Sequence, residues 1–225
     1  MTVDLSLVRL LVAKDWQLFQ KQLALYVLAG IVALCFLGLA KPWAFYVGAL
    51  MLLIVMVSIA CFSISTSLLV ERKEKTLAFV MSLPVSPREF TYAKVAGNLV
   101  TFLVPFLGIL GATLAVVLFT PLPDGLFVYA LLVFAWVLFA FSVSLAVVMA
   151  VESEGWATFA MIGSMVLINP YLMGLTMVPA IKDRIGEDAI VFSAPALLIL
   201  AGLLAASVLL VGATTWHHAR KPAFY

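Results

Sequence analysis

The residues of this chain best suited to contact a soluble molecule lie in one charged segment between two long apolar stretches. Residues 71–77 read ERKEKTL, and residues 82–89 read SLPVSPRE. The remainder of the first half of the chain carries few charges in succession. Such a segment is typical either of a binding surface for a soluble partner or of a charged loop that sets membrane topology.

Side chains suited to catalysis or metal binding are sparse. The two histidines, His217 and His218, are adjacent and lie beside Trp216, Arg220 and Lys221. Adjacent histidines supply at most part of a metal site, whereas aromatic and basic residues at the end of an apolar stretch are typical interface anchors. The apolar stretches hold no paired carboxylates and no serine with histidine at depth. We therefore expect no enzyme, no metal and no cofactor in this chain, and no proton or sodium relay.

Small polar residues mark one of the apolar stretches. Ser58, Cys61 and Ser65 recur at three- and four-residue spacing, which places them on one face of a helix. Small residues allow close helix contact in membranes, and hydroxyls can bond across helices. The face is interpreted either as helix packing or as the lining of a polar path. Both cysteines, Cys35 and Cys61, are expected to pack as small buried hydrophobes.

A second row of residues lies later in the chain, at a strict four-residue step. Its members are Met161, Met165, Asn169, Met173 and Met177. A four-residue step drifts around a straight helix, and Pro170 removes a hydrogen bond there, so the two halves of the row need not share a face. The row is interpreted either as core or lipid-facing residues or as an adaptable apolar lining for amphipathic substrates.

The composition indicates a membrane protein. Hydrophobic residues make up 65% of the chain, charged residues 11%, and the mean hydropathy is +1.21, whereas soluble proteins carry about 25% charged residues. The apolar stretches do not alternate as barrel strands do, so the sequence predicts an all-α polytopic fold. The net charge of +2 is too small to indicate a nucleic-acid partner. We expect an interfacial amphipathic helix over 1–22 and spans at 23–40, 44–69, 93–119, 126–150, 157–179 and 190–216.

The distribution of basic residues predicts the orientation. With the N-terminus inside, ten Lys and Arg residues are cytoplasmic and three are outside. Basic residues concentrate on the cytoplasmic side of membrane proteins. We therefore expect a multi-pass protein of the inner (cytoplasmic) membrane with both termini and the 71–92 elbow in the cytoplasm.

The elbow is expected to contain a short amphipathic helix and a capped helix start. Leu77, Val80 and Met81 follow helical spacing, and Pro84 ends the pattern. A two-turn helix is marginal by itself in water, so it must pack on lipid, on the bundle or on a partner. Residues 86–89 (SPRE) then form a capping box that predicts the start of the third spanning helix.

This segment resembles the permease subunit of ABC-2 type ABC transporters. The resemblance in motif covers about 25 residues, from 70 to 95, and it extends in outline over the six spans and the interfacial helix. One difference from the family pattern is Lys75, which stands where a glycine is usual. The matching residues are Glu71, Arg72, Thr76, Leu77, the run 82–86 (SLPVS), Glu89 and Lys94.

The resemblance implies a coupling helix that contacts a separate ATPase subunit, which binds the ATP and Mg. This chain has no GxxxxGK[ST] phosphate loop of its own. In the family, the loop between spans four and five makes a second contact, and spans two and five meet a second permease copy or paralogue. The implied ATPase contacts are Glu71, Arg72, Glu74, Lys75, Thr76, Leu77, Val80, Met81, Pro84, Glu152 and Glu154. The implied pathway or dimer interface comprises Ser58, Cys61, Ser65, Met161, Met165, Asn169 and Met173.

We therefore expect one ABC-2 type transmembrane domain over 1–225, exporting a hydrophobic or amphipathic substrate in contact with membrane lipid. Two alternatives remain open. The chain also resembles the haem-exporter B subunit of cytochrome c maturation, and a non-transporting membrane scaffold is compatible with the composition.

Overall fold

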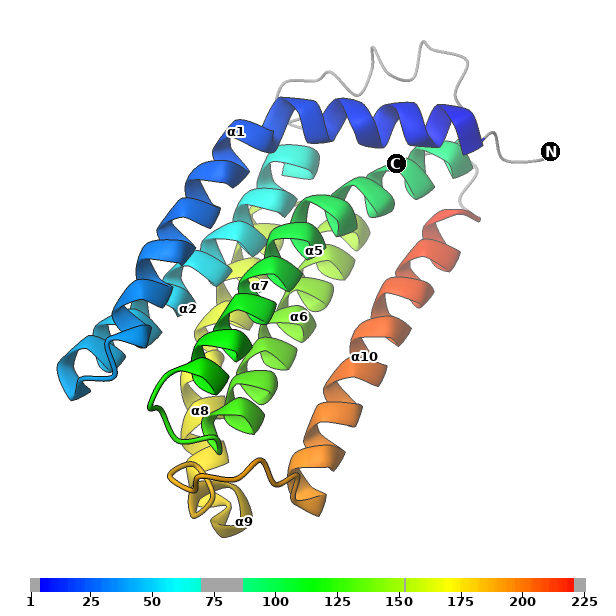
Figure 1. Cartoon of the computed structure of the whole chain (residues 1–225). Helices are drawn as coiled ribbons and strands as arrows, with labels where there is room; N and C mark the ends of the chain where they lie inside the picture. The colour runs from blue at the N-terminus through cyan, green and yellow to red at the C-terminus, as the bar shows by residue number, and fades with distance from the viewer. Residues whose placement is uncertain (1–4, 70–86, 152, 221–225) are drawn as a thin grey trace.

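The computed structural model describes residues 5–69, 87–151 and 153–220, and every regular element in these residues is helical (Figure 1). The elements are α1 (Leu5–Gly38), α2 (Pro42–Ile64), a π-helical turn η1 (Ser65–Leu69), α5 (Pro87–Phe119), α6 (Leu126–Ala150), α7 (Glu154–Val166), α8 (Ile168–Met177), α9 (Pro179–Lys182) and α10 (Ala194–His218).

Six stretches of these helices are long and apolar enough to cross a membrane, which fits a multi-pass membrane protein. The predicted all-α polytopic fold is thus confirmed. The stretches are Val8–Gly38, Pro42–Leu68, Arg88–Phe119, Leu126–Ala150, Glu154–Met177 and Ala194–His218.

The N-terminal segment differs from the expected division into an interfacial helix and a separate first span. Both parts belong to the single helix α1, which bends so that its first part crosses one end of the bundle before the rest runs beside α2 (Figure 1). The helix continues because no glycine or proline interrupts the sequence from Leu5 to Ala29. The first part also packs on the bundle, where the ring of Phe19 lies 5.7 Å from that of Phe62 in an edge-to-face contact.

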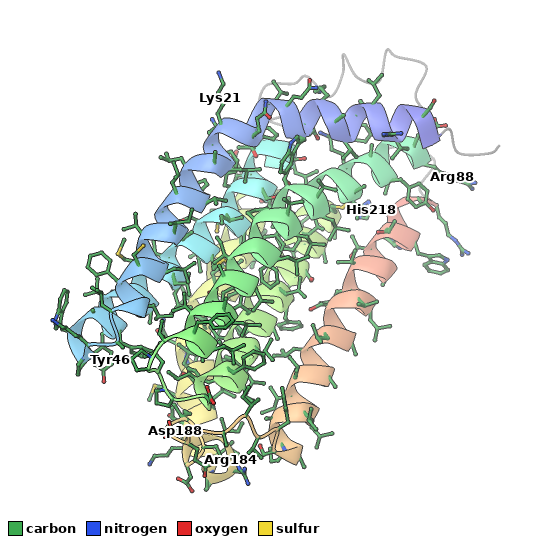
Figure 2. All side chains as sticks on the ribbon, viewed as in Figure 1. Lys21, Tyr46, Arg88, Arg184, Asp188 and His218 are labelled. Atoms are coloured by element: carbon green, nitrogen blue, oxygen red, sulfur yellow. The ribbon has the colours of Figure 1, made fainter. Side chains whose placement is uncertain are left out.

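Successive long helices run in opposite directions, so the connections lie at two ends of the bundle. Lys21, Arg88 and His218 lie at one end, which we call the charged end (Figure 2). Tyr46, Arg184 and Asp188 lie at the opposite end. The charged end thus holds the first part of α1, the start of α5 and the end of α10, in keeping with the predicted placement of these segments on one side of the membrane.

The core lies where α2, α5 and α6 meet. Phe102 and Phe141 are fully buried and stack with their ring centroids 3.9 Å apart. At the hairpin of α1 and α2 the two backbones themselves are close, because Gly48 lies against the backbone of α1. A Cβ added at Gly48 would come 2.7 Å from the nitrogen of Leu37. Without a hydrophobic effect between helices in lipid, such close packing is the main source of association.

One cysteine was predicted wrongly. Cys61 is partly buried and packs against the core, but Cys35 is exposed on α1. In a membrane, an apolar side chain can face lipid as well as the protein core. The apolar sequence around each cysteine therefore did not show which of the two would be buried.

Candidate functional site

A buried polar cluster lies at the charged end, between the first part of α1, the end of α2 and the start of α5. We call it the polar cluster; its members are Asp15, Ser63, Ser67, Lys94, Asn98 and Thr101, each under 9% exposed. Its charged pair is Lys94 Nζ and Asp15 Oδ2, 3.5 Å apart, with side chains 7% and 8% exposed. A buried ion pair is costly to form and costly to break, so it fixes the relative position of α1 and α5.

Hydrogen bonds extend the polar cluster from α5 to the end of α2. Lys94 Nζ donates to the carbonyl of Ser67 at 3.3 Å. The amide of Asn98 donates to Ser67 Oγ at 3.0 Å and to the carbonyl of Lys94 at 2.8 Å. Ser63 Oγ and Thr101 Oγ1 lie 2.6 Å apart. These side-chain bonds tie two spans together in a region where unsatisfied polar groups are expensive.

The end of α2 has a local geometry that suits these contacts. Residues Ser65–Leu69 form the π-helical turn η1, and Ser67 lies within it. Such turns shift the backbone bonding pattern and occur often at functional sites. In this chain the carbonyl and the hydroxyl of Ser67 both accept hydrogen bonds from α5.

A glycine on α5 permits the approach of α1. A Cβ added at Gly97 would come 3.3 Å from Asp15 Oδ2, which is tighter than ordinary side-chain contacts. The absence of a side chain at Gly97 therefore leaves room for the buried carboxylate next to its lysine partner.

The predicted ATPase contacts in the elbow lie outside the described residues. These are Glu71, Arg72, Glu74, Lys75, Thr76, Leu77, Val80, Met81 and Pro84, together with Glu152 in the second loop.

The structure does describe what flanks the elbow: η1 ends at Leu69, and α5 begins at Pro87, as the capping box predicted. Arg88 Nε donates to the carbonyl of Ala219 at 3.1 Å, which joins the start of α5 to the end of α10. The exposed residue Glu154 begins α7, at the same end of the bundle as these flanks (Figure 1).

Among the predicted pathway or interface residues, the structure brings two into contact. Ser65 Oγ lies 3.8 Å from the sulfur of Met161, between η1 and α7. Ser58 and Cys61 are partly buried on α2. The hydroxyl bonds from α2 to another helix come instead from Ser63, on a different face from the predicted one.

The predicted row on the fifth span divides into two halves. Met161 and Met165 are buried on α7, whereas Asn169 and Met173 are exposed on α8. The two helices meet at Leu167. The break fits the position of Pro170, which has no N–H for the carbonyl of residue Val166.

The amide of Asn169 compensates for the missing backbone donor at this break. Its Nδ2 donates to the carbonyl of Val166 at 3.4 Å. Asn169 thus acts here as a local substitute for the proline N–H, while its predicted part in a lining or interface stays a prediction.

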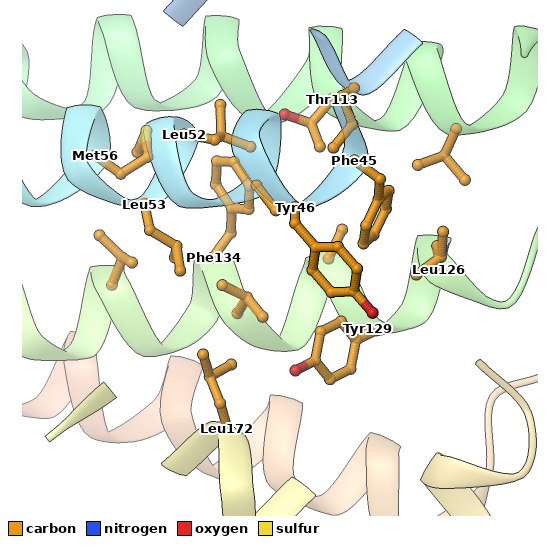
Figure 3. A pocket seen from close by; sticks show the side chains of 16 residues that line it. Phe45, Tyr46, Leu52, Leu53, Met56, Thr113, Leu126, Tyr129, Phe134 and Leu172 are labelled. Carbon is orange, nitrogen blue, oxygen red and sulfur yellow. The ribbon is translucent and has the colours of Figure 1, made fainter. Parts of the chain in front are cut away.

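A pocket of about 380 Å³ lies at the opposite end, between α2, α5, α6 and α8 (Figure 3). We call it the apolar pocket. Leu52, Met56 and Phe134 form part of its inner wall, while the rings of Tyr46 and Tyr129 lie close together (Figure 3). Its volume lies within the range of about 300–1,000 Å³ typical of small-molecule sites.

Sequence reasoning missed Asp15 and Asn98 as members of a site. Asp15 is the one acidic residue on a helix whose other charges, Arg9, Lys14 and Lys21, are basic. In the sequence, that isolated carboxylate and the lysine near the start of the third span were the features that could have indicated a buried ion pair. The apolar pocket left no signal, because its lining comes from separate apolar helices.

Comparison with known proteins adds no identification: no family model, curated protein or solved structure matches the chain.

Proposed function

We propose that the chain is the membrane-spanning permease subunit of an ABC-2 type exporter. A separate ATPase subunit binds ATP and Mg and hydrolyses the ATP, and the transported molecule is hydrophobic or amphipathic. Two copies of this chain, or one copy and a paralogue, form the membrane part. The charged end faces the cytoplasm.

The observation that supports this proposal is the polar cluster. It connects η1 and α5, the two elements that flank the charged segment 70–86, and it connects both to the first part of α1. A force applied to that segment would reach α2 and α5 together, because their flanking ends share buried hydrogen bonds. This is the arrangement that a permease driven by a cytoplasmic motor requires.

The start of α5 supports the same proposal through a second contact. Arg88 holds the carbonyl of Ala219 at the end of α10, so a displacement of the start of α5 also acts on the last span. Four of the spanning stretches are thereby linked at the end where we place the ATPase.

The test is purification of a tagged chain in mild detergent from its native cell, with mass spectrometry of what accompanies it. We expect an ATPase subunit, and we expect the double charge reversal Glu71→Lys with Arg72→Glu to remove it without preventing membrane insertion. The matched control reverses a pair at the opposite end, Arg184→Glu with Glu187→Arg, which are 3.9 Å apart. This control should retain the ATPase.

Other outcomes select among the alternatives. An ATPase that arrives with cytochrome c maturation proteins would favour a haem-exporter B-like subunit. A folded chain with no ATPase at all would contradict the proposal and favour a membrane scaffold.

A further inference from the structure

The apolar pocket has no part in the coupling role proposed above. Its lining includes none of the predicted pathway residues and none of the polar cluster. Within the described part of the chain, no charged side chain lines it. A well-formed apolar pocket with a few polar groups at one side is the usual form of a ligand site.

The depth of the pocket matches one leaflet of a bilayer. Its lining runs along α2 from Phe45 to Met56 and along α6 from Leu126 to Val137, eleven residue steps in each case. At about 1.5 Å per residue this is about 16 Å. The hydrocarbon core is about 30 Å thick, so the pocket reaches from the end of the bundle to the middle of the membrane.

The polarity of the pocket changes along this depth. Met56 and Phe134 at the inner end are 1% and 4% exposed, whereas Tyr46 at the mouth is 73% exposed. Thr113 adds no free polar group, because its hydroxyl donates to the carbonyl of Ile109 at 2.7 Å. The free hydroxyls of the lining are therefore the two phenols near the mouth, from Tyr46 and Tyr129 (Figure 3).

A second, smaller cavity adjoins this mouth. Tyr129 also lines a small neighbouring cavity, and Arg184 lines that same cavity. The guanidinium of Arg184 itself pairs with Glu187, 3.9 Å away, so the donors at the mouth are the phenol hydroxyls, which can bond the ester and phosphate oxygens of a lipid head group.

We propose that the apolar pocket binds one acyl chain of a membrane phospholipid from the leaflet opposite the charged end. The chain fills the space between α2 and α6, and the head group lies at the phenols of Tyr46 and Tyr129. The binding site stands on the pocket alone. That the bound phospholipid is also the transported molecule rests on the proposed function.

The experiment uses the full chain in vesicles containing a phosphatidylethanolamine with a diazirine on one acyl chain. After illumination, labelled residues are located by mass spectrometry. Bulk lipid cannot reach Met56 and Phe134, so labels there report entry into the pocket. Leu198 and Leu209, 74% and 70% exposed on α10, report contact with bulk lipid and serve as the internal control.

Filling the pocket provides the comparison. Ala130→Trp and, from the facing helix, Ala49→Phe place bulk in the lining. Each should reduce labelling at Met56 and Phe134 by about tenfold, which corresponds to about 1.4 kcal/mol of binding. Labelling at Leu198 and Leu209 should not change. The matched control is Ala205→Trp at an exposed position of α10, which should leave all four labels as in the unmodified chain.

The proposal is overturned if Met56 and Phe134 remain unlabelled in the unmodified chain, or if both filling variants leave their labelling unchanged. It is also overturned if a diazirine fatty acid labels these residues and the phospholipid does not. No ATPase is present in this experiment, so its failure is separate from failure of the proposed function.

Discussion

At the scale of single residues, the pair Asp15 and Lys94 governs how α1 is held. Its two partners are almost wholly buried and 3.5 Å apart. Lys94→Met removes the buried partner of Asp15 and leaves its carboxylate only Lys14, whose Nζ is 3.9 Å away on a half-exposed side chain. This should lower the free energy of unfolding by about 3 kcal/mol, the lower end of the range for a broken buried pair. The double variant Asp15→Leu with Lys94→Met removes both charges and should lie within about 1 kcal/mol of the unmodified chain. Denaturant titration in detergent, followed by circular dichroism, measures all three.

An exposed pair gives the control for this cycle. Arg184 and Glu187 lie 3.9 Å apart with side chains 40% and 48% exposed. Arg184→Met should change the free energy of unfolding by less than about 1 kcal/mol. A double variant as unstable as Lys94→Met alone would mean that the ion pair is not what holds α1 in place.

The residue scale is also where the sequence was least informative. Ser67 and Asn98 are far apart in the chain, and only the packing of α2 against α5 brings them to 3.0 Å. A pattern of spacings within one helix cannot reveal a partner on another helix. Ser58 and Cys61 were chosen from such a pattern, yet it is Ser63, between Cys61 and Ser65 in the sequence, that bonds to Thr101 on α5.

At the scale of elements, the hairpin of α1 and α2 depends on a single small residue. A Cβ at Gly48 would lie 2.7 Å from Leu37 N and 2.8 Å from the carbonyl of Ala33, both backbone atoms that cannot move aside. Gly48→Ala should therefore lower the free energy of unfolding by about 1–3 kcal/mol. Gly111→Ala, where a Cβ meets nothing within 4 Å, is the matched control and should be neutral or slightly stabilising. Equal thermal stability of the two variants would contradict the close approach.

The break in the fifth span gives a second prediction at this scale. Asn169→Leu removes the donor that reaches the carbonyl of Val166, and it should cost about 0.6 kcal/mol, the average for such bonds in membranes. In a Pro170→Ala background the backbone N–H of residue 170 can donate to that carbonyl instead. Asn169→Leu should then cost nothing measurable. A double-mutant cycle of unfolding free energies tests this, and the same cost in both backgrounds would show that Asn169 does not replace the proline N–H.

The elements themselves were largely predictable because hydropathy and helix stops are local properties. The fourth span was predicted at 126–150, and α6 has these bounds. The second span, predicted to reach residue 69, ends with η1 at Leu69. The segments predicted at 1–22 and 23–40 belong to one bent helix, α1, because amphipathic and apolar segments with no helix breaker between them join. Where a helix bends is set by what it packs on, which the local sequence does not contain.

At the scale of the whole molecule, the distribution of charge predicts how the bundle sits in the membrane. Of the described basic residues, three lie at the opposite end: Lys41 directly before α2, Lys182 at the end of α9, and Arg184 (Figures 1 and 2). The others belong to the elements of the charged end (Figure 1): Arg9, Lys14 and Lys21 to the first part of α1, Arg88 and Lys94 to the start of α5, and Arg220 to the residues just after α10. An excess of basic residues favours the cytoplasmic side. The proposed ATPase can act on the charged segment only if that end faces the compartment that supplies ATP, and the phospholipid site then opens to the outer leaflet.

Cysteine accessibility in intact cells tests this orientation. In a background with Cys35→Ala and Cys61→Ala, Glu187→Cys places a thiol at the opposite end, and Ser153→Cys places one at the charged end; both positions are exposed. A membrane-impermeant maleimide added outside should label the first and leave the second unlabelled, and permeabilised cells should label both. Labelling of Ser153→Cys alone in intact cells would place the charged end outside. The coupling proposal would then fail, because no cytoplasmic motor could reach the segment between η1 and α5, and the apolar pocket would face the inner leaflet instead.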